Sequence, residues 1–176
     1  MKYLIYLVLI GAVIGVTSGL FNSWGLSLVV PDLILLLVIA LSVIFETLDY
    51  LFVAVVGGFW LDIVYSLPIG SFTIPLVLCG AASSFFLKRW LFTEIRWYHF
   101  MLAILAATVF LKVWIWGYAN VIFLTHWFNY GISWKQMLRR LPLNILSNLI
   151  VAYPLYTIVE MFARSQLRWQ KNRLRL

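Results

Sequence analysis

The chain has 176 residues, of which 64% are hydrophobic and only 11% charged, and its mean hydropathy is +1.00. Soluble globular domains carry about 45–50% apolar and about 25% charged residues. This composition argues against a soluble domain and predicts an integral membrane protein. The formal charge of +7 is interpreted as a topology signal from basic residues in loops, and nucleic-acid binding is not expected.

Six apolar segments predict transmembrane helices, since a span needs about 20 apolar residues. Their unbroken runs lack the two-residue alternation of barrel strands, and a helix satisfies its backbone polar groups internally, as hydrocarbon requires. The expected fold is an all-α integral membrane bundle with spans at residues 3–20, 26–45, 48–65, 69–87, 98–124 and 143–162. Residues 1–163 are assigned to this transmembrane domain and residues 164–176 to a basic cytoplasmic tail.

The N-terminal stretch MKYLIYLVLIGAVIGV shares some features with a signal peptide: one lysine, an apolar stretch and small residues. The apolar stretch is long, however, and no clean cleavage site follows it. We therefore interpret it as the first span.

Lysine and arginine in the loops predict that both termini are cytoplasmic, because cytoplasmic loops are enriched in these residues. With the N-terminus inside, nine basic residues lie on the inner side and three on the outer side. The basic tail is also expected to attract anionic lipid headgroups.

Residues 131–144 differ from the apolar spans because they carry three basic residues between apolar ones. The apolar residues can share one side of a helix, which predicts an interfacial helix on the outer surface. This helix serves either as a headgroup anchor or as a docking surface for a partner protein. Its candidate contacts are Trp134, Met137, Arg139 and Arg140.

Two ionisable side chains lie inside predicted spans, where a charge is costly and marks a candidate functional site. At a rise of 1.5 Å per residue, Asp62 lies about 21 Å along the third span and Lys112 about 22 Å along the fifth. Equal depth predicts a salt bridge between them or a shared polar network. Alternatively, Lys112 snorkels alone and Asp62 meets water near its helix end. Asn144, Ser147 and Asn148 are expected to supply interhelical hydrogen bonds from the sixth span.

Asp32 follows Pro31 and is expected in the first turn of a helix, where a proline and a carboxylate are both favourable. From Pro31 to Phe45 such a helix would measure only about 22 Å, which is short for a span. The residues before it either line an outward-facing cavity or begin an ordinary span. Glu46 and Asp49, in the next turn, are expected to face the cytoplasm.

Small residues in the spans are interpreted as packing features. Gly57 and Gly58 offer a smooth helix surface for close approach of a neighbour. Cys79 is the single cysteine, so no disulfide forms within the chain, and it is expected to be buried as a small hydrophobe.

No catalytic constellation is evident. His99 and His126 are expected at opposite membrane interfaces, and no group of residues has the spacing of a metal site. We therefore expect no enzymatic activity, no cofactor and no metal.

Several short motifs follow one another in a fixed order. They are Pro31-Asp32-Leu33, the stretch from Gly58 to Asp62, the turn from Pro68 to Gly70, the pair Lys88-Arg89, and Asn148 followed by Pro154. In this order and spacing the chain resembles the MreD family of rod-shape-determining membrane proteins, over residues 29–89 above all. One departure is the turn FETLDY, which is acidic where family members often carry Arg and Gly, so no role of a basic residue there transfers to this chain.

The resemblance implies a compact six-helix bundle, similar to the substrate-binding subunits of energy-coupling-factor vitamin transporters, in the bacterial inner membrane. It also implies a non-enzymatic scaffold that binds the bitopic protein MreC. The scaffold would work in the elongation machinery of peptidoglycan synthesis, with the MreB cytoskeleton, a transpeptidase and a glycosyltransferase. The shared architecture also suggests an alternative, a solute-binding subunit of a membrane transporter. That alternative requires an outer cavity that closes over a small ligand.

Overall fold

The computed structural model describes residues 2–23, 32–44, 47–90, 97–124 and 134–173. Within these ranges the chain forms six helices and no strand, which confirms the predicted all-helical fold. The helices are α1 (Lys2–Ser23), α2 (Leu33–Ile44), α3 (Thr47–Val64), α4 (Thr73–Trp90), α5 (Trp97–Leu124) and α6 (Trp134–Arg173).

The short helix α2 lies at the centre of the molecule. It contacts all five other helices, and Leu36, Val38 and Ile39 are fully buried. Its sequence, LILLLVIALSVI, is apolar around the whole circumference, as expected for a helix enclosed on every side.

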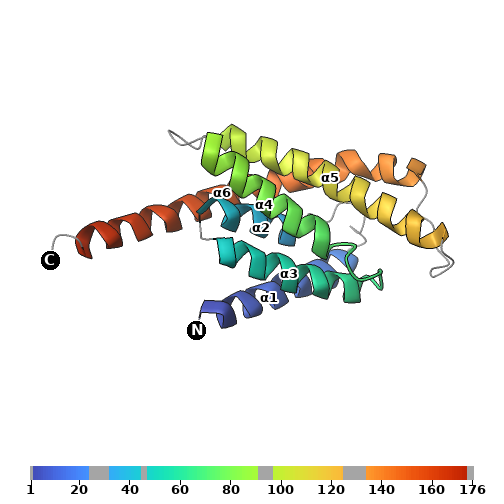
Figure 1. The fold of residues 1–176 in the computed structure, drawn as a ribbon, viewed down its shortest axis with the longest axis horizontal. Helices are drawn as coiled ribbons and strands as arrows, with labels where there is room; N and C mark the ends of the chain where they lie inside the picture. The colour runs from blue at the N-terminus through green and yellow to red at the C-terminus, as the bar shows by residue number, and fades with distance from the viewer. Residues whose placement is uncertain (1, 24–31, 45–46, 91–96, 125–133, 174–176) are drawn as a thin grey trace.

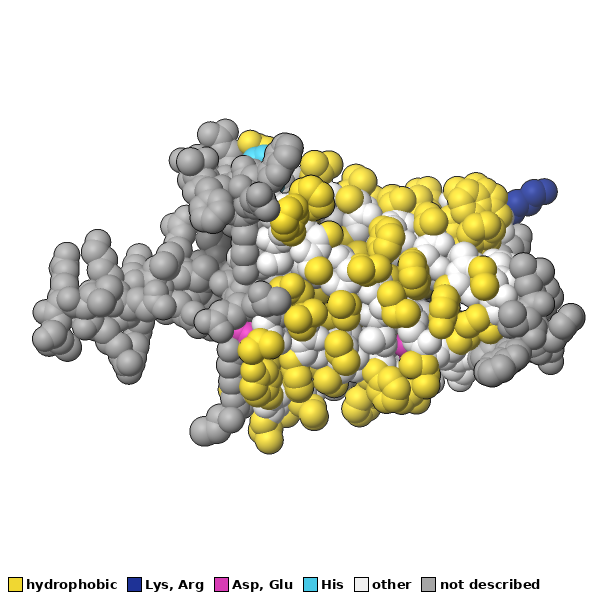
Figure 2. Space-filling view, in the orientation of Figure 1, with side chains coloured by type: hydrophobic (Ala, Val, Ile, Leu, Met, Phe, Trp, Pro, Cys, Tyr) yellow, Lys and Arg dark blue, Asp and Glu magenta, His cyan; other side chains and the backbone are white. Residues whose placement is uncertain are grey.

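The other five helices surround α2 as an open ring in the order α1, α3, α4, α5 and α6, with each in contact with the next (Figure 1). Each of them also presents large apolar side chains outward. Leu4 on α1 is 71% exposed, Ile63 on α3 60%, Leu102 on α5 65% and Ile150 on α6 64%. Figure 2 shows one face of the molecule, over which hydrophobic side chains are spread with few charged ones between them.

Two helices are long and apolar enough to cross a membrane, judged by length and composition. They are Trp97–Ile122, within α5, and Met137–Ile158, within α6. Three further apolar segments, Tyr3–Thr17, Leu33–Val43 and Thr73–Phe86, are shorter. This comparison covers only the described residues, and the six-span arrangement with its orientation stays a prediction.

Helix α6 differs from the sequence-based expectation. A separate interfacial helix at residues 131–144 was predicted, but α6 runs without interruption for 40 residues from Trp134, with Pro142 and Pro154 inside it. A proline removes one backbone donor and restricts the preceding turn, yet the helix continues through both. The predicted boundary near Asn144 is therefore wrong. The basic segment from residue 164 to Arg173 also continues the same helix.

Helices α3 and α4 approach each other closely at Gly58. A Cβ atom built on this glycine would lie 2.6 Å from the Cα and 2.9 Å from the backbone nitrogen of Thr73. Only a residue without a side chain fits such a contact between backbones. The predicted packing role of Gly58 is confirmed.

We predict that Gly58→Ala destabilises the fold by about 1–3 kcal/mol, because the new methyl group must push the two backbones apart. Gly11→Ala is the matched control, since nothing lies within 4 Å of the added carbon on α1 and alanine favours a helix by about 0.5–1 kcal/mol. Thermal unfolding of both variants in detergent measures the difference. Equal melting temperatures for the two variants would contradict the close contact.

Candidate functional site: two joints centred on aspartates

The turn between α3 and α4 is built around Asp62. The amide of Leu67 donates to the carbonyl of Asp62 at 3.0 Å, and the amide of Ser66 donates to the carbonyl of Ile63 at 3.1 Å. Ser66 has a φ of 50°. This pair of bonds with a left-handed residue is the Schellman motif, which ends a helix by satisfying its last carbonyls.

The side chain of Asp62 then begins the next helix. Its Oδ2 accepts from the amide of Gly70 at 2.9 Å and from the hydroxyl of Thr73 at 2.8 Å, and its Oδ1 accepts from the amide of Phe72 at 2.7 Å. These amides precede or open α4, where a helix leaves donors unsatisfied. Asp62, 1% exposed, therefore joins the end of α3 to the start of α4. We call Asp62, Gly70, Phe72 and Thr73 the α3–α4 joint.

The rest of the turn is fixed by backbone geometry and by α5. Gly70 has a φ of 102°, a conformation that glycine adopts without steric cost. The carbonyl of Pro68 accepts from both the amide and the hydroxyl of Ser71. The hydroxyl of Tyr118 on α5 donates to the carbonyl of Ile69 at 2.9 Å. These contacts explain the Pro68–Gly70 motif as a tight turn docked on α5.

A second joint forms at the start of α2. Asp32 is the N-cap residue rather than a residue of the first turn: α2 begins at Leu33, and the carbonyl of Asp32 accepts the first helical bond, from Leu36, at 3.1 Å. Its carboxylate lies 3.0 Å from the Nζ of Lys112 on α5. The two side chains are 18% and 20% exposed, respectively. Pro31 lies outside the described residues.

Asn148 on α6 completes this second joint. Its amide oxygen accepts from the backbone amide of Asp32 at 2.7 Å, and its NH₂ group donates to Thr108 Oγ1 at 2.9 Å and to Asp32 Oδ2 at 3.4 Å. Thr108 in turn donates to the carbonyl of Ile104, one turn earlier on α5. We call Asp32, Thr108, Lys112 and Asn148 the α2 joint.

The chemistry of both joints is structural. Each carboxylate oxygen accepts from a named donor, and the hydroxyl of Thr108 is committed as both donor and acceptor. A buried polar network in which every member is satisfied fixes one arrangement of the surrounding elements. Among the residues that the structure describes, no three His, Cys, Asp or Glu side chains gather as metal ligands.

The predicted pair of Asp62 with Lys112 is wrong, because each has another partner. Lys112 binds Asp32, whereas the carboxylate of Asp62 binds the turn that follows its own helix. The expectation that Asn148 supplies an interhelical bond is confirmed. Ser147 instead donates to the carbonyl of Asn144 in its own helix.

Three of the four candidate docking residues on α6 are accessible. Trp134 is 44% exposed, and its ring lies edge-on to that of Trp116 with centroids 4.8 Å apart. Arg139 and Arg140 are exposed as well. Met137 is only 9% exposed, so its assignment to a docking surface is wrong: this side of α6 packs inward.

Some contributors were not recognised in the sequence. Thr108 lies four residues before Lys112, so the two share a helix face, and that spacing was the available signal. Thr73 follows the Pro68–Gly70 turn as a residue that commonly caps helices.

Asp49, expected to face the cytoplasm, is 1% exposed in the first turn of α3. Glu46 lies outside the described residues, and Cys79 is buried as predicted.

Comparisons with protein-family models, with curated proteins and with solved structures find no match to this chain.

We predict that Asp62→Asn destabilises the protein by about 2–3 kcal/mol, because an amide group replaces an oxygen that accepts from buried donors. Thr73→Val removes one of the three bonds and is expected to cost about 1 kcal/mol. Thermal or denaturant unfolding in detergent ranks the two. An Asp62→Asn variant as stable as the parent would show that the turn does not depend on the carboxylate.

For the α2 joint we predict coupled effects of Asp32 and Lys112. Lys112→Met leaves a largely buried carboxylate without its cation and is expected to cost about 2–3 kcal/mol, below the fully buried limit because both groups retain some exposure. Adding Asp32→Asn should recover part of this loss, with a coupling energy of about 1–2 kcal/mol. Lys135→Met, on an exposed lysine of α6, is the matched control. Additive effects in the double variant would contradict the ion pair.

Proposed function

We propose that this chain is a six-span protein of the bacterial inner membrane with both termini in the cytoplasm, and that it acts as a non-enzymatic scaffold of the cell-elongation machinery, in the manner of the MreD family. The observation that carries this proposal is the outward apolar face on each of the five helices around α2. Soluble monomers rarely expose contiguous apolar patches above a few hundred Å². Lipid is the environment that would cover such a surface.

The dimensions of α2 agree with this placement. Its 12 residues give about 18 Å of helix, less than the about 30 Å of a hydrocarbon core. A helix enclosed by protein does not need to reach both headgroup layers. Its N-cap ends within the bundle, where Asp32 meets Lys112 and Asn148, and irregular backbone is tolerated at membrane depth when protein surrounds it.

A scaffold is supported by what the polar side chains do. The residues that carry the family resemblance hold helices together: Gly58 permits the α3–α4 contact, Asp62 and Gly70 build the turn, and Asp32 and Asn148 connect α2 to α6. Because these groups are engaged with each other, they are not directed at a solute.

We place the partner, an MreC-type bitopic membrane protein, on the N-terminal turns of α6. Trp134 and Leu138 lie one turn apart and are 44% and 46% exposed, with Arg139 and Arg140 beside them. Aromatic residues and arginine are the residues most enriched at protein interfaces. The elongation transpeptidase and glycosyltransferase would join through the same complex.

Site-specific photocrosslinking in a rod-shaped bacterium tests this proposal. A photoreactive amino acid replaces Trp134 or Arg139 in the full chain, which is co-expressed with a tagged MreC-type partner. We expect a covalent adduct with the partner from these positions and none from Leu4 on α1, which is 71% exposed and thus more accessible than Trp134. If the partner does not copurify with the chain and neither α6 position forms an adduct, the proposed function is contradicted.

A further inference from the structure

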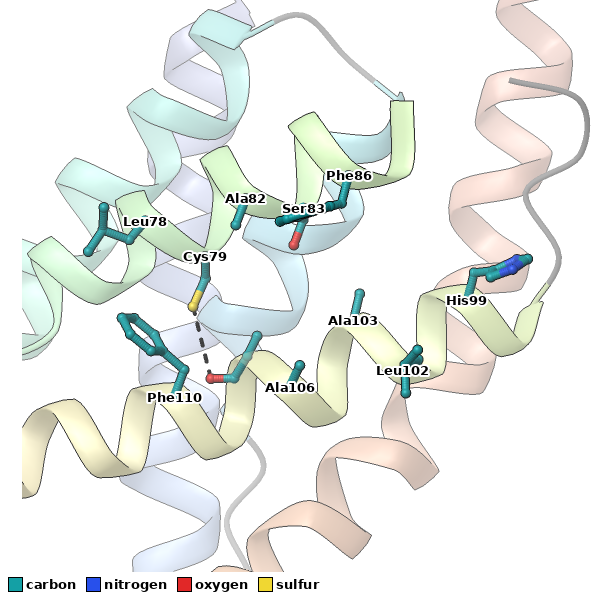
Figure 3. A pocket seen from close by; sticks show the side chains of 11 residues that line it. Leu78, Cys79, Ala82, Ser83, Phe86, His99, Leu102, Ala103, Ala106 and Phe110 are labelled. Atoms are coloured by element: carbon teal, nitrogen blue, oxygen red, sulfur yellow. Dashed lines mark hydrogen bonds between the residues drawn. The ribbon is translucent and has the colours of Figure 1, made fainter. Parts of the chain in front are cut away.

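An open groove separates parts of α4 and α5 (Figure 3). Its volume is about 840 Å³. Small side chains form much of its lining, among them Ala82 and Ser83 on α4 and Ala103 and Ala106 on α5. Because these side chains are short, the two helices leave space between them that their own atoms do not fill. We call this space the α4–α5 groove.

The two helices are in contact at one end of the groove. The Sγ of Cys79 lies 3.9 Å from the carbonyl oxygen of Ala107, where the helices meet. Phe110 lies beside this contact, and from there α4 and α5 diverge toward the end that holds Phe86 and His99 (Figure 3). From Phe110 to His99 the groove follows α5 for about 16 Å.

This length is about half of the about 30 Å hydrocarbon core, which is the depth of one leaflet. A partner's transmembrane helix would contact the protein over the whole core and is about 10 Å wide. A groove of about half that length does not match it. A single lipid acyl chain, which reaches from the headgroup to the middle of the bilayer, does match.

The imidazole of His99 lies at the end of the groove where α4 and α5 diverge. The Nδ1 atom of His99 is buried and has no hydrogen-bond partner among the described residues. A buried polar atom without a partner is unfavourable, and an imidazole nitrogen can donate to an ester or phosphate oxygen. Elsewhere the lining is apolar, apart from Cys79 and Ser83. The groove is therefore an apolar channel with the imidazole of His99 at one end.

Two basic residues in the neighbouring sequence favour a lipid with an anionic headgroup. Lys88 and Arg89 follow Phe86 by two and three positions and directly precede Trp90, the last residue of α4. Their backbone positions therefore lie toward the same end of α4 as Phe86, the end that is cytoplasmic in the topology proposed above. Basic residues next to a membrane attract anionic lipids.

We propose that the α4–α5 groove binds one acyl chain of an anionic phospholipid, with His99 donating to an oxygen at the glycerol or phosphate level. The inference rests on the membrane residence proposed above but not on the scaffold role or its partner. The lipid stabilises the pair α4 and α5 where their own side chains leave space.

Photolabelling in vesicles tests the site. The purified full chain is reconstituted without any partner in phosphatidylcholine that contains a small fraction of phosphatidylglycerol with a diazirine on its acyl chain. After irradiation, labelled peptides are mapped by mass spectrometry. We expect labels concentrated on the groove residues of α4 and α5, and fewer labels there when the diazirine is carried by phosphatidylcholine.

Two variants and a control make the result specific. Ala106→Phe fills the groove and should reduce its labelling to the level of the other outward faces. Ala12→Phe makes the same change at an exposed alanine of α1 and should leave the groove labelling unchanged. The paired changes Lys88→Gln and Arg89→Gln leave the groove lining unchanged and should remove the preference for phosphatidylglycerol, which provides a readout that does not depend on the folding of Ala106→Phe.

Uniform labelling of all outward faces, unchanged by Ala106→Phe, would overturn the site while leaving membrane residence intact. Failure of the chain to insert into the vesicles would overturn membrane residence and the site together. A crosslink from Ala106 to a partner's transmembrane helix in cells, with no lipid label in vesicles, would assign the groove to a protein instead. Loss of the α6 crosslinks with the lipid label retained would remove only the scaffold proposal.

Discussion

The carboxylate of Asp32 is the contact on which the arrangement of three helices depends. It accepts from Lys112 and Asn148, which lie 80 and 116 residues further along the chain on α5 and α6. Helix α2 is short, apolar on all sides and enclosed by the other five helices. Apolar contacts are non-directional, so they hold this helix in the core without fixing its depth or rotation. The ion pair and the Asn148 bonds supply that direction.

The α3–α4 joint solves the same problem with a different geometry. Asp62 ends α3 through its backbone carbonyl and begins α4 through its carboxylate, and Gly58 lets the two helices touch. With charges and turns satisfied inside, the outer helix faces need no polar groups and are free to meet lipid or another protein. The α4–α5 groove is the exception, because there small side chains leave space that this chain does not fill.

The sequence predicted those features that depend on residue type and not those that depend on direction. Long apolar runs predicted the all-helical fold, and Gly58 was expected at a close helix contact. The Asp62–Lys112 pair failed because the rise along a helix gives depth but not the direction in which a side chain points. The boundary inside α6 failed because prolines and basic residues resemble a break. A proline does not break a helix when the surrounding helices accommodate it, and basic residues do not break one when they lie on an exposed face.

The most direct test of this account is the topology of the chain in living cells. Single cysteines in a Cys79→Ala background replace Tyr3, Trp97 and Ile69, whose side chains are 45%, 57% and 69% exposed. A membrane-impermeant maleimide added to spheroplasts should label the cysteine at position 69, in the α3–α4 turn, and should label positions 3 and 97 only after lysis. Labelling of position 3 or 97 without lysis, or protection of position 69, would contradict the proposed bundle and its orientation.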